Sequence, residues 1–185
     1  MKEEFLYNEN VIFIWIIEVV KGMGFIRWLF GKDESISNDA IEHSSKGEFT
    51  YHPKTKKISK MKSGGHGQEN IEFLNQNNLR YQIVKEYNNG VRVGNVPDHK
   101  TPKKRTGTNQ SWFPKDWDRK EIRKAGNFVA RSNRKKEDGV QAVATYKGVK
   151  IGIRRTNGKV ATIYPISKQK GGFKNEDRKH CRKSK

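Results

Sequence analysis

Two Asn-Gly pairs restrict this chain to a fold that contains antiparallel strands. Asn89-Gly90 and Asn157-Gly158 each separate two runs rich in β-branched and aromatic residues. An Asn-Gly pair between such runs is the strongest short-range signal for a β-hairpin, because both residues tolerate the positive φ angles of the tight turn. The first pair predicts a hairpin over residues 81–96. The second, together with an earlier Lys-Gly turn, predicts a three-stranded meander over residues 139–166.

Two helices are predicted between these strands. Residues 68–76 place two apolar side chains on one helical face before an Asn-Asn stop. Residues 118–131 begin with the spacing of a capping box and carry Ile122, Ala125 and Val129 as an apolar stripe. We therefore expect the α+β class, with N-terminal helices packed on a small antiparallel sheet and a loosely ordered N-terminal extension.

The ends of the chain differ in composition from its middle. Residues 11–30 are the most apolar run, but charged residues interrupt it, so we expect a partly helical segment and no stable membrane insertion. Residues 31–60 are polar and predict a linker, in which residues 49–52 are the candidate for a short edge strand. The expected organisation is an N-terminal extension (1–60), a folded domain (61–167) and a basic disordered tail (168–185).

The charge balance indicates the kind of partner. The 185 residues include 39 Lys and Arg against 20 Asp and Glu, which gives a net charge of +19 and a pI near 10.0. Such an excess predicts a polyanionic partner, which is a nucleic acid, an acidic membrane or an acidic protein. The single cysteine, Cys181, excludes an internal disulfide and offers no metal cluster.

Three segments carry side chains suited to chemistry. His66 is bracketed by glycines in Ser63-Gly64-Gly65-His66-Gly67, and His99 opens a long basic loop over residues 97–117. Thr162 and Tyr164 are two apart on a predicted strand and so share a face. Two histidines, a lysine cluster and two hydroxyls are the parts needed to cleave RNA without a metal. The alternative is a flexible glycine linker with an incidental histidine and an ordinary strand.

Three aromatic residues of the same loop, Trp112, Phe113 and Trp117, argue against disorder. We expect them to pack on the core; stacking on nucleotide bases is the alternative.

These segments together resemble the bacterial EndoU nuclease family, toxin domains found at the C-termini of larger secreted proteins. The resemblance rests on four stretches in order, which are Gly64-Gly65-His66-Gly67, Pro97-Asp98-His99-Lys100, the run from Lys104 through Ser111-Trp112-Phe113-Pro114 to Trp117, and Thr162-Ile163-Tyr164-Pro165. It implies a fold shared with barnase and RelE-like ribonucleases, cleavage of RNA, and a cognate immunity protein. It also implies secretion or delivery by a secretion system and action in the cytoplasm of a target cell.

The family roles imply a catalytic set in this sequence. His66 and His99 would be the paired acid and base, Lys104 would steady the phosphate, and Thr162 and Tyr164 would bind the scissile phosphate or base. The expected RNA-binding residues of the loop are Lys100, Lys103, Arg105, Thr106 and Ser111. Many relatives carry a lysine close to the Phe-Pro-x-x-Trp segment, where this chain has Gln110. Neither a metal nor another cofactor is expected.

The reaction implied by these parts uses the 2′-hydroxyl of RNA as its nucleophile. One histidine removes the hydroxyl proton, the second protonates the departing 5′-oxygen, and cation and hydroxyl donors stabilise the phosphoryl oxygens. The expected product carries a 2′,3′-cyclic phosphate, and DNA should resist cleavage. The sequence leaves open which histidine is the acid, and whether the target is tRNA, rRNA or any single-stranded RNA. We expect the immunity protein to be acidic at its contact face.

Three other functions compete with this interpretation. A metal-dependent DNase toxin would need carboxylates near the histidines, and the nearby Glu69 and Asp98 form no recognisable ligand pattern. A non-catalytic nucleic-acid-binding module explains the charge but not the glycine-bracketed histidine. A membrane-acting toxin would have to use residues 11–30.

Overall fold

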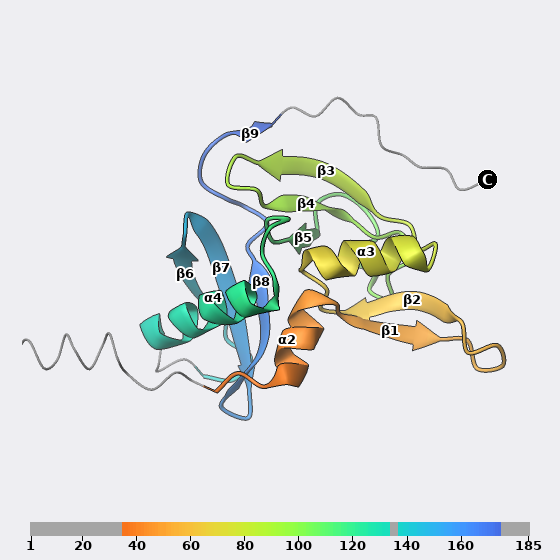
Figure 1. The fold of residues 1–185 in the computed structure, drawn as a ribbon, viewed down its shortest axis with the longest axis horizontal. Coiled ribbons are helices and arrows are strands. Elements are labelled where there is room, and N and C mark those ends of the chain that lie inside the picture. Colours follow the sequence, from red (N-terminus) through yellow and green to blue (C-terminus); the bar gives the residue numbers. More distant parts are fainter. Residues whose placement is uncertain (1–34, 134–136, 175–185) are drawn as a thin grey trace, which may run out of the picture. The chain divides into compact units, whose positions relative to one another are not determined.

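The computed structural model describes residues 35–133 and 137–174 of the chain (Figure 1). The apolar run at 11–30, most of the expected N-terminal extension and the end of the basic tail lie outside the described residues.

Strands and three short α-helices make up this part of the chain. In chain order, the elements are α2 (Asn38–Ser45), β1 (Glu48–Tyr51), β2 (Ile58–Ser63), α3 (Gln68–Gln76), β3 (Gln82–Tyr87), β4 (Arg92–Asn95), the 3-10 turn η1 (Pro102–Lys104), β5 (Gln110–Trp112), α4 (Arg119–Ser132), β6 (Ala142–Tyr146), β7 (Val149–Thr156), β8 (Lys159–Pro165) and β9 (Phe173–Lys174). The described strands form three antiparallel sheets, with the orders β1-β2, β5-β4-β3-β9 and β6-β7-β8. The α+β class is confirmed, although the helices accompany several small sheets where we expected one.

The strongest sequence signals are confirmed. Both Asn-Gly pairs sit in hairpin turns, between β3 and β4 and between β7 and β8. Helix α3 has the predicted bounds. Helix α4 begins as a capping residue predicts, because the Asp118 side chain accepts a hydrogen bond from the backbone N–H of Glu121 at 2.7 Å.

The linker expected over residues 31–60 is wrong, since it contains α2, β1 and the start of β2. Ser37 caps α2 by accepting from the backbone N–H of Ala40 at 3.1 Å, and Ile36, Ala40 and Ile41 are buried. Strand β1 overlaps the candidate edge strand predicted over residues 49–52 but begins one residue earlier, and its partner β2 is lysine-rich. Contacts with the rest of the domain, rather than local propensity, stabilise so short and polar a helix.

The disordered tail expected from residue 168 onward is also wrong over residues 168–174. Gln169 is buried, and its side-chain amide bonds both backbone groups of Lys150, at 2.8 Å and 3.0 Å. The chain then continues to β9, which pairs with β3. The sequence pattern could not predict that residues 168–174 pack back on the domain, because one buried glutamine in a basic stretch gives no periodic signal.

Two apolar clusters hold these elements together. The larger lies among α2, α4 and the β6-β7-β8 sheet and includes Ile122, Ile153 and Ile163. The smaller lies beneath α3 and includes Leu74 and Trp112. The described loop aromatics are buried, with Trp112 and Phe113 fully so and Trp117 at 8% exposure, which confirms the packing interpretation.

Candidate active site

The loop that carries His66 rests on the end of α2. The backbone N–H groups of residues 65–67 donate in succession to the carbonyls of His43, Ser44 and Ser45, at 2.9, 2.6 and 2.9 Å. The last carbonyls of a helix lack intrahelical partners, and the loop supplies them. The position of the His66 backbone is therefore fixed by a regular element.

The glycines of this loop are required by its conformation. Gly64 and Gly65 have φ angles of +69° and +67°, in the left-handed region that favours glycine. A Cβ at Gly64 would overlap the carbonyl oxygen of His43, and a Cβ at Gly65 would overlap the side chain of Asn70. The interpretation of this stretch as a flexible linker is wrong, because it is a tightly docked turn.

His66 is buried, and one of its ring nitrogens has a defined partner. Its Nδ1 lies 2.7 Å from the backbone carbonyl oxygen of Ser111. Since a carbonyl only accepts, Nδ1 carries the proton, and Nε2 of the neutral ring keeps its lone pair. Burial, and then the positive charge of Lys104, lower the pKa of His66 to about 3.

His99 is positioned by β2. The backbone N–H of Met61 donates to the Asp98 carbonyl at 2.9 Å, and the N–H of Lys100 donates to the Met61 carbonyl at 2.7 Å. The Asp98 carboxylate is bound by Arg80, with NH2 to Oδ1 at 2.7 Å. Asp98 therefore anchors the segment that presents His99.

The ring of His99 is bonded in the opposite sense from that of His66. Its Nδ1 accepts a hydrogen bond from the backbone N–H of Thr101 at 2.9 Å. Neutral His99 therefore carries its proton on Nε2. Burial, followed by the charges of Lys104 and Arg105, lowers the pKa of His99 to about 4.

Lys104 links the two histidine segments. Its charge acts on both imidazoles, and its Nζ donates to Gln110 Oε1 at 3.0 Å. The amide nitrogen of Gln110 in turn donates to the Gly65 carbonyl at 2.7 Å, next to His66. Burial, and then the charge of Lys103, lower the pKa of Lys104 to about 8, so the side chain is mostly protonated at neutral pH. Gln110, noted from sequence only as a departure from the family, is fully buried and joins Lys104 to the loop.

Strand β8 brings Tyr164 against His66. The two ring centroids lie 5.6 Å apart. Ile163, on the opposite face of the strand, is fully buried, which confirms that Thr162 and Tyr164 share the outward face. The site thus gathers His66, His99, Lys104 and Tyr164, and places Thr162 on the same strand face as the tyrosine.

Strand β7 and the residue before β6 orient the tyrosine. The Tyr164 hydroxyl accepts from Gln141 Nε2 at 2.7 Å and lies 3.4 Å from Arg154 Nε. Gly152 is the cross-strand partner of Tyr164, and a Cβ there would lie 3.0 Å from Tyr164 Cε2. Sequence analysis missed Arg154, an exposed cation beside the tyrosine, because only the β7–β8 register reveals it.

The expected RNA-binding residues of the loop fall into two groups. Lys100, Lys103 and Thr106 are exposed. Arg105 is exposed too, but it fixes the loop by donating from Nε to the His99 carbonyl at 2.8 Å. Ser111 is buried, and its hydroxyl donates to the Pro165 carbonyl at 2.7 Å, so it connects β5 to the end of β8.

The family of bacterial EndoU nucleases matches residues 37–167 of the chain. The chain belongs to the bacterial EndoU nuclease family. The match starts at the cap of α2 and ends just after β8, so the matched region of this EndoU nuclease includes the helix that supports His66. No curated protein and no solved structure matches the chain.

Two further features concern the described part of this EndoU nuclease. Across residues 35–133 and 137–174, no three His, Cys, Asp or Glu side chains are grouped so as to hold a metal ion. No helix in the same part of the chain is long and apolar enough to cross a membrane.

Proposed function

We propose that this EndoU nuclease is a metal-independent endoribonuclease that cleaves RNA by attack of the 2′-hydroxyl and leaves a 2′,3′-cyclic phosphate. The observation that carries the proposal is the opposite hydrogen bonding of the two imidazoles. His66 has its proton on Nδ1 and a free lone pair on Nε2, whereas His99 has its proton on Nε2. The transesterification requires a base that accepts the proton of the 2′-hydroxyl and a proton donor for the departing 5′-oxygen.

His66 is the base in this proposal. Its Nε2 takes the proton of the 2′-hydroxyl, and the 2′-oxygen forms a bond to the adjacent phosphorus. The Ser111 carbonyl, 2.7 Å from Nδ1, stabilises the imidazolium that results, since it accepts from the Nδ1–H of both the neutral and the charged ring. The low pKa keeps free His66 in the neutral form that can act as a base.

His99 is the donor. As the bond from phosphorus to the 5′-oxygen breaks, protonated His99 gives its Nε2 proton to that oxygen. The neutral ring that results keeps its proton on Nδ1, so the backbone N–H of Thr101, which bonds this nitrogen in the resting protein, is released when His99 becomes protonated. A bound phosphodiester is an anion that opposes the field of Lys104 and Arg105, the two charges that lower the pKa of His99. RNA binding therefore raises this pKa and favours the protonated donor. Water then carries a proton from His66 back to His99.

The remaining groups stabilise the phosphoryl oxygens. Lys104 supplies a positive charge that is mostly present at neutral pH, and Thr162 and Tyr164 supply hydroxyls. Removing one such preorganised donor typically costs about a hundred- to a thousand-fold in rate. Arg154, beside the tyrosine hydroxyl, adds a further cation on this face.

The deciding experiment is cleavage of a mixed RNA and a matched DNA in excess EDTA. We expect the RNA to be cut to cyclic-phosphate ends and the DNA to remain intact. His66→Ala should abolish cleavage, while Lys120→Ala, a change at an exposed side chain of α4, should not. Loss of activity in EDTA, or cleavage of DNA, would instead support a metal-dependent DNase.

The roles of the two histidines are separable with an activated substrate. A ribonucleoside 3′-(4-nitrophenyl phosphate) has a leaving group that needs no proton. We expect His99→Ala to regain most of its activity on this ester, whereas His66→Ala stays inactive. Recovery of the His66 variant alone would reverse the two roles.

The biological setting follows from the family and belongs to the same proposal. The nuclease acts as a toxin that a secretion system delivers, and it cleaves RNA in the cytoplasm of the target cell. A cognate immunity protein protects the producer by covering the site. Because exposed Lys100 and Lys103 lie on the loop that carries Lys104, the contact face of that protein should be acidic. Co-purification of the toxin with such a partner, and loss of RNA cleavage in the complex, would test this.

A further inference from the structure

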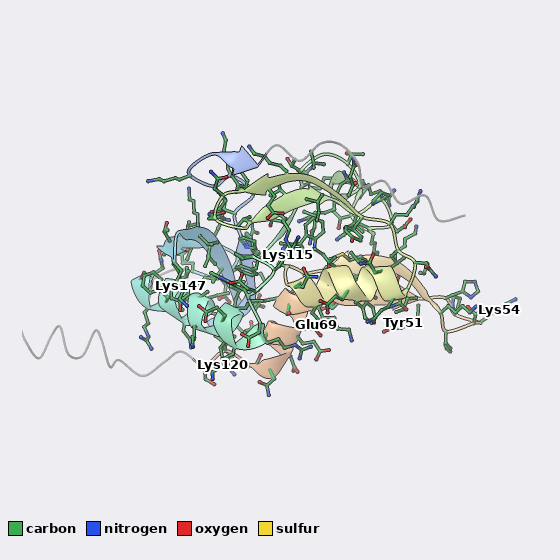
Figure 2. All side chains as sticks on the ribbon, turned by 45° about the horizontal axis from the view of Figure 1, so that its top comes forward. Tyr51, Lys54, Glu69, Lys115, Lys120 and Lys147 are labelled. Atoms are coloured by element: carbon green, nitrogen blue, oxygen red, sulfur yellow. The ribbon has the colours of Figure 1, made fainter. Side chains whose placement is uncertain are left out.

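The turn between β1 and β2 directs every side chain outward. Residues 51–57 are all exposed, and Tyr51, at 60%, is one of the few large apolar side chains of the described chain that is mostly in solvent. From residue 51 to residue 62 the sequence has no Asp or Glu. It has five lysines, namely Lys54, Lys56, Lys57, Lys60 and Lys62. Figure 2 labels Tyr51 and Lys54 toward the end of this hairpin.

Packing within the domain does not explain these side chains. The hairpin packs on the smaller apolar cluster through Phe49, Ile58 and Met61, which lie on the strands and not in the turn. Lys62 pairs with Glu48 at 2.8 Å. Within the described residues, Lys54, Lys56 and Lys57 form no ion pair. Three like charges in one short turn repel one another, so a counter-charge from a partner would stabilise the arrangement.

The hairpin is continuous with the catalytic segments. Strand β2 ends at Ser63, three residues before His66, and its Met61 hydrogen-bonds on both sides of His99. Lys60 is close enough to Asp98 for its charge to help lower the pKa of that carboxyl. A strand rises about 3.3 Å per residue, so Ile58 and Ser63 are separated by roughly 17 Å. The turn therefore lies several nucleotides away from the phosphate at His66.

We propose that the β1–β2 hairpin is an RNA-binding arm that holds the strand flanking the scissile phosphodiester. Its lysines contact phosphates, and Tyr51 stacks on an unpaired base. This inference rests on the proposed ribonuclease function and narrows its substrate class to RNA that extends well beyond the cleaved bond. Lysine is depleted in the cores of protein–protein interfaces, whereas phosphate contacts use it freely, so an RNA strand fits this surface better than a protein does.

The first test measures binding without cleavage. The ligand is a fluorescent 2′-O-methyl RNA of about thirty nucleotides, which has no free 2′-hydroxyl to attack. The arm variant replaces Lys54, Lys56 and Lys57 with Gln in the full chain. The control variant replaces three exposed lysines outside the hairpin with Gln, namely Lys120, Lys159 and Lys168, and so loses the same charge.

We expect the arm variant to lose affinity at least about ten-fold and the slope of log K against log salt to fall by roughly 2, because each lost phosphate contact removes about 0.7–0.9. Tyr51→Ala should weaken binding of single-stranded RNA more than of duplex RNA. Unchanged affinity and slope in the arm variant, or an equal loss in the control, would overturn the inference. An arm variant that binds RNA normally but binds the immunity protein weakly would assign the hairpin to protein recognition.

The second test measures cleavage and separates the two proposals. The arm variant should raise KM for the long RNA and leave kcat/KM for a dinucleotide unchanged, since a dinucleotide does not reach the turn. If the wild type cleaves no RNA but the arm variant still binds RNA more weakly than the wild type, the ribonuclease proposal is wrong and the proposal of an RNA-binding arm stands. If RNA is cleaved but the arm variant and the control variant bind RNA with the same affinity, the arm proposal is wrong and the ribonuclease proposal stands.

Discussion

Lys104 and Gln110 behave as a single unit at the residue scale. The ammonium group contacts the amide oxygen at 3.0 Å, and the amide nitrogen contacts the carbonyl beside His66 at 2.7 Å. The family resemblance led us to expect a lysine near the aromatic segment, where this chain has Gln110. The positive charge thus reaches the site from the loop, and the glutamine supplies the support.

An exchange of these two residues tests that interpretation. Lys104→Gln should lower kcat/KM by about a hundred-fold or more, because it removes the cation that we propose stabilises the phosphoryl oxygens. Adding Gln110→Lys should recover at least about ten-fold of this loss, since it returns an ammonium group to almost the same place. A double variant no better than Lys104→Gln alone, with an intact fold by circular dichroism, would contradict the shared role.

The buried histidines also make stability depend on pH. Folding lowers the pKa of His66 from 6.5 to about 3, so between these values the unfolded chain binds a proton that the folded chain does not. Stability therefore rises with pH in this window and is lost as the pH falls below about 6.5, by roughly 2 kcal/mol per such histidine at pH 5. His99, with a pKa of about 4, acts in the same direction.

His66→Gln should reduce this dependence, because the amide can still donate to the Ser111 carbonyl but does not titrate. Urea unfolding at pH 7.5 and pH 5 measures the effect. The drop in unfolding free energy should be smaller in this variant than in the wild type, whereas Thr156→Val, a change at an exposed residue that does not titrate, should behave as the wild type. The pKa of Glu48 is lowered to about 2, so it adds to acid sensitivity only below the window used.

Residue types and loop context made both histidines, Thr162 and Tyr164 candidates from the sequence, and the family resemblance added Lys104. They were not enough for Gln110, Gln141 and Arg154. These three side chains act through contacts with strands or loops that are distant in the chain. Their residue types carry no chemical signal of their own, so only the register and the packing reveal them.

At the element scale, the paired strands β7 and β8 form the surface on which Tyr164 lies. Gly152 has no side chain, and this lets the tyrosine ring lie across β7 while its hydroxyl accepts from Gln141 at 2.7 Å. Strands and helices with strong local signals were predicted well, as α3 and both Asn-Gly hairpins demonstrate. Helix α2 and strand β9 were not, because short polar segments owe their structure to the partners they dock on.

Gly152→Val should therefore damage function without loosening the sheet. A branched side chain suits a strand, but its Cβ would press on Gln141, Tyr164 and Ile166, each 3.0 Å away. We expect kcat/KM to fall about ten-fold through the displaced tyrosine, with Tm nearly unchanged. Thr156→Val, at the exposed end of the same strand, is the matched control. Full activity in the glycine variant would show that the position of the ring is unimportant.

At the scale of the whole molecule, the catalytic domain needs its first helix. Helix α2 packs against β8 and α4 and carries the His66 loop on its last carbonyls (Figure 1). The sequence suggested that the domain begins near residue 61, because both histidines and every family motif lie beyond that point. The geometry shows that the support for those motifs precedes them.

Two shortened chains test this dependence. A chain of residues 35–185 should fold cooperatively and cleave RNA, whereas a chain of residues 61–185 should do neither, although it keeps every residue assigned to the chemistry. Thermal unfolding and RNA cleavage measured side by side decide the matter. If the 61–185 chain cleaves RNA as fast as the 35–185 chain, activity does not depend on α2.

Ser44, a buried residue of α2, contacts both the His66 loop and strand β8. Its carbonyl holds the His66 backbone at 2.6 Å, and its hydroxyl accepts from the backbone N–H of Ile163 at 2.9 Å, between Thr162 and Tyr164. Loss of this one side chain would disconnect strand β8 from the helix that holds the His66 loop, so it would inactivate the nuclease while leaving both histidines in place. Degenerate copies of this domain should therefore be recognised by position 44 as well as by their missing catalytic residues.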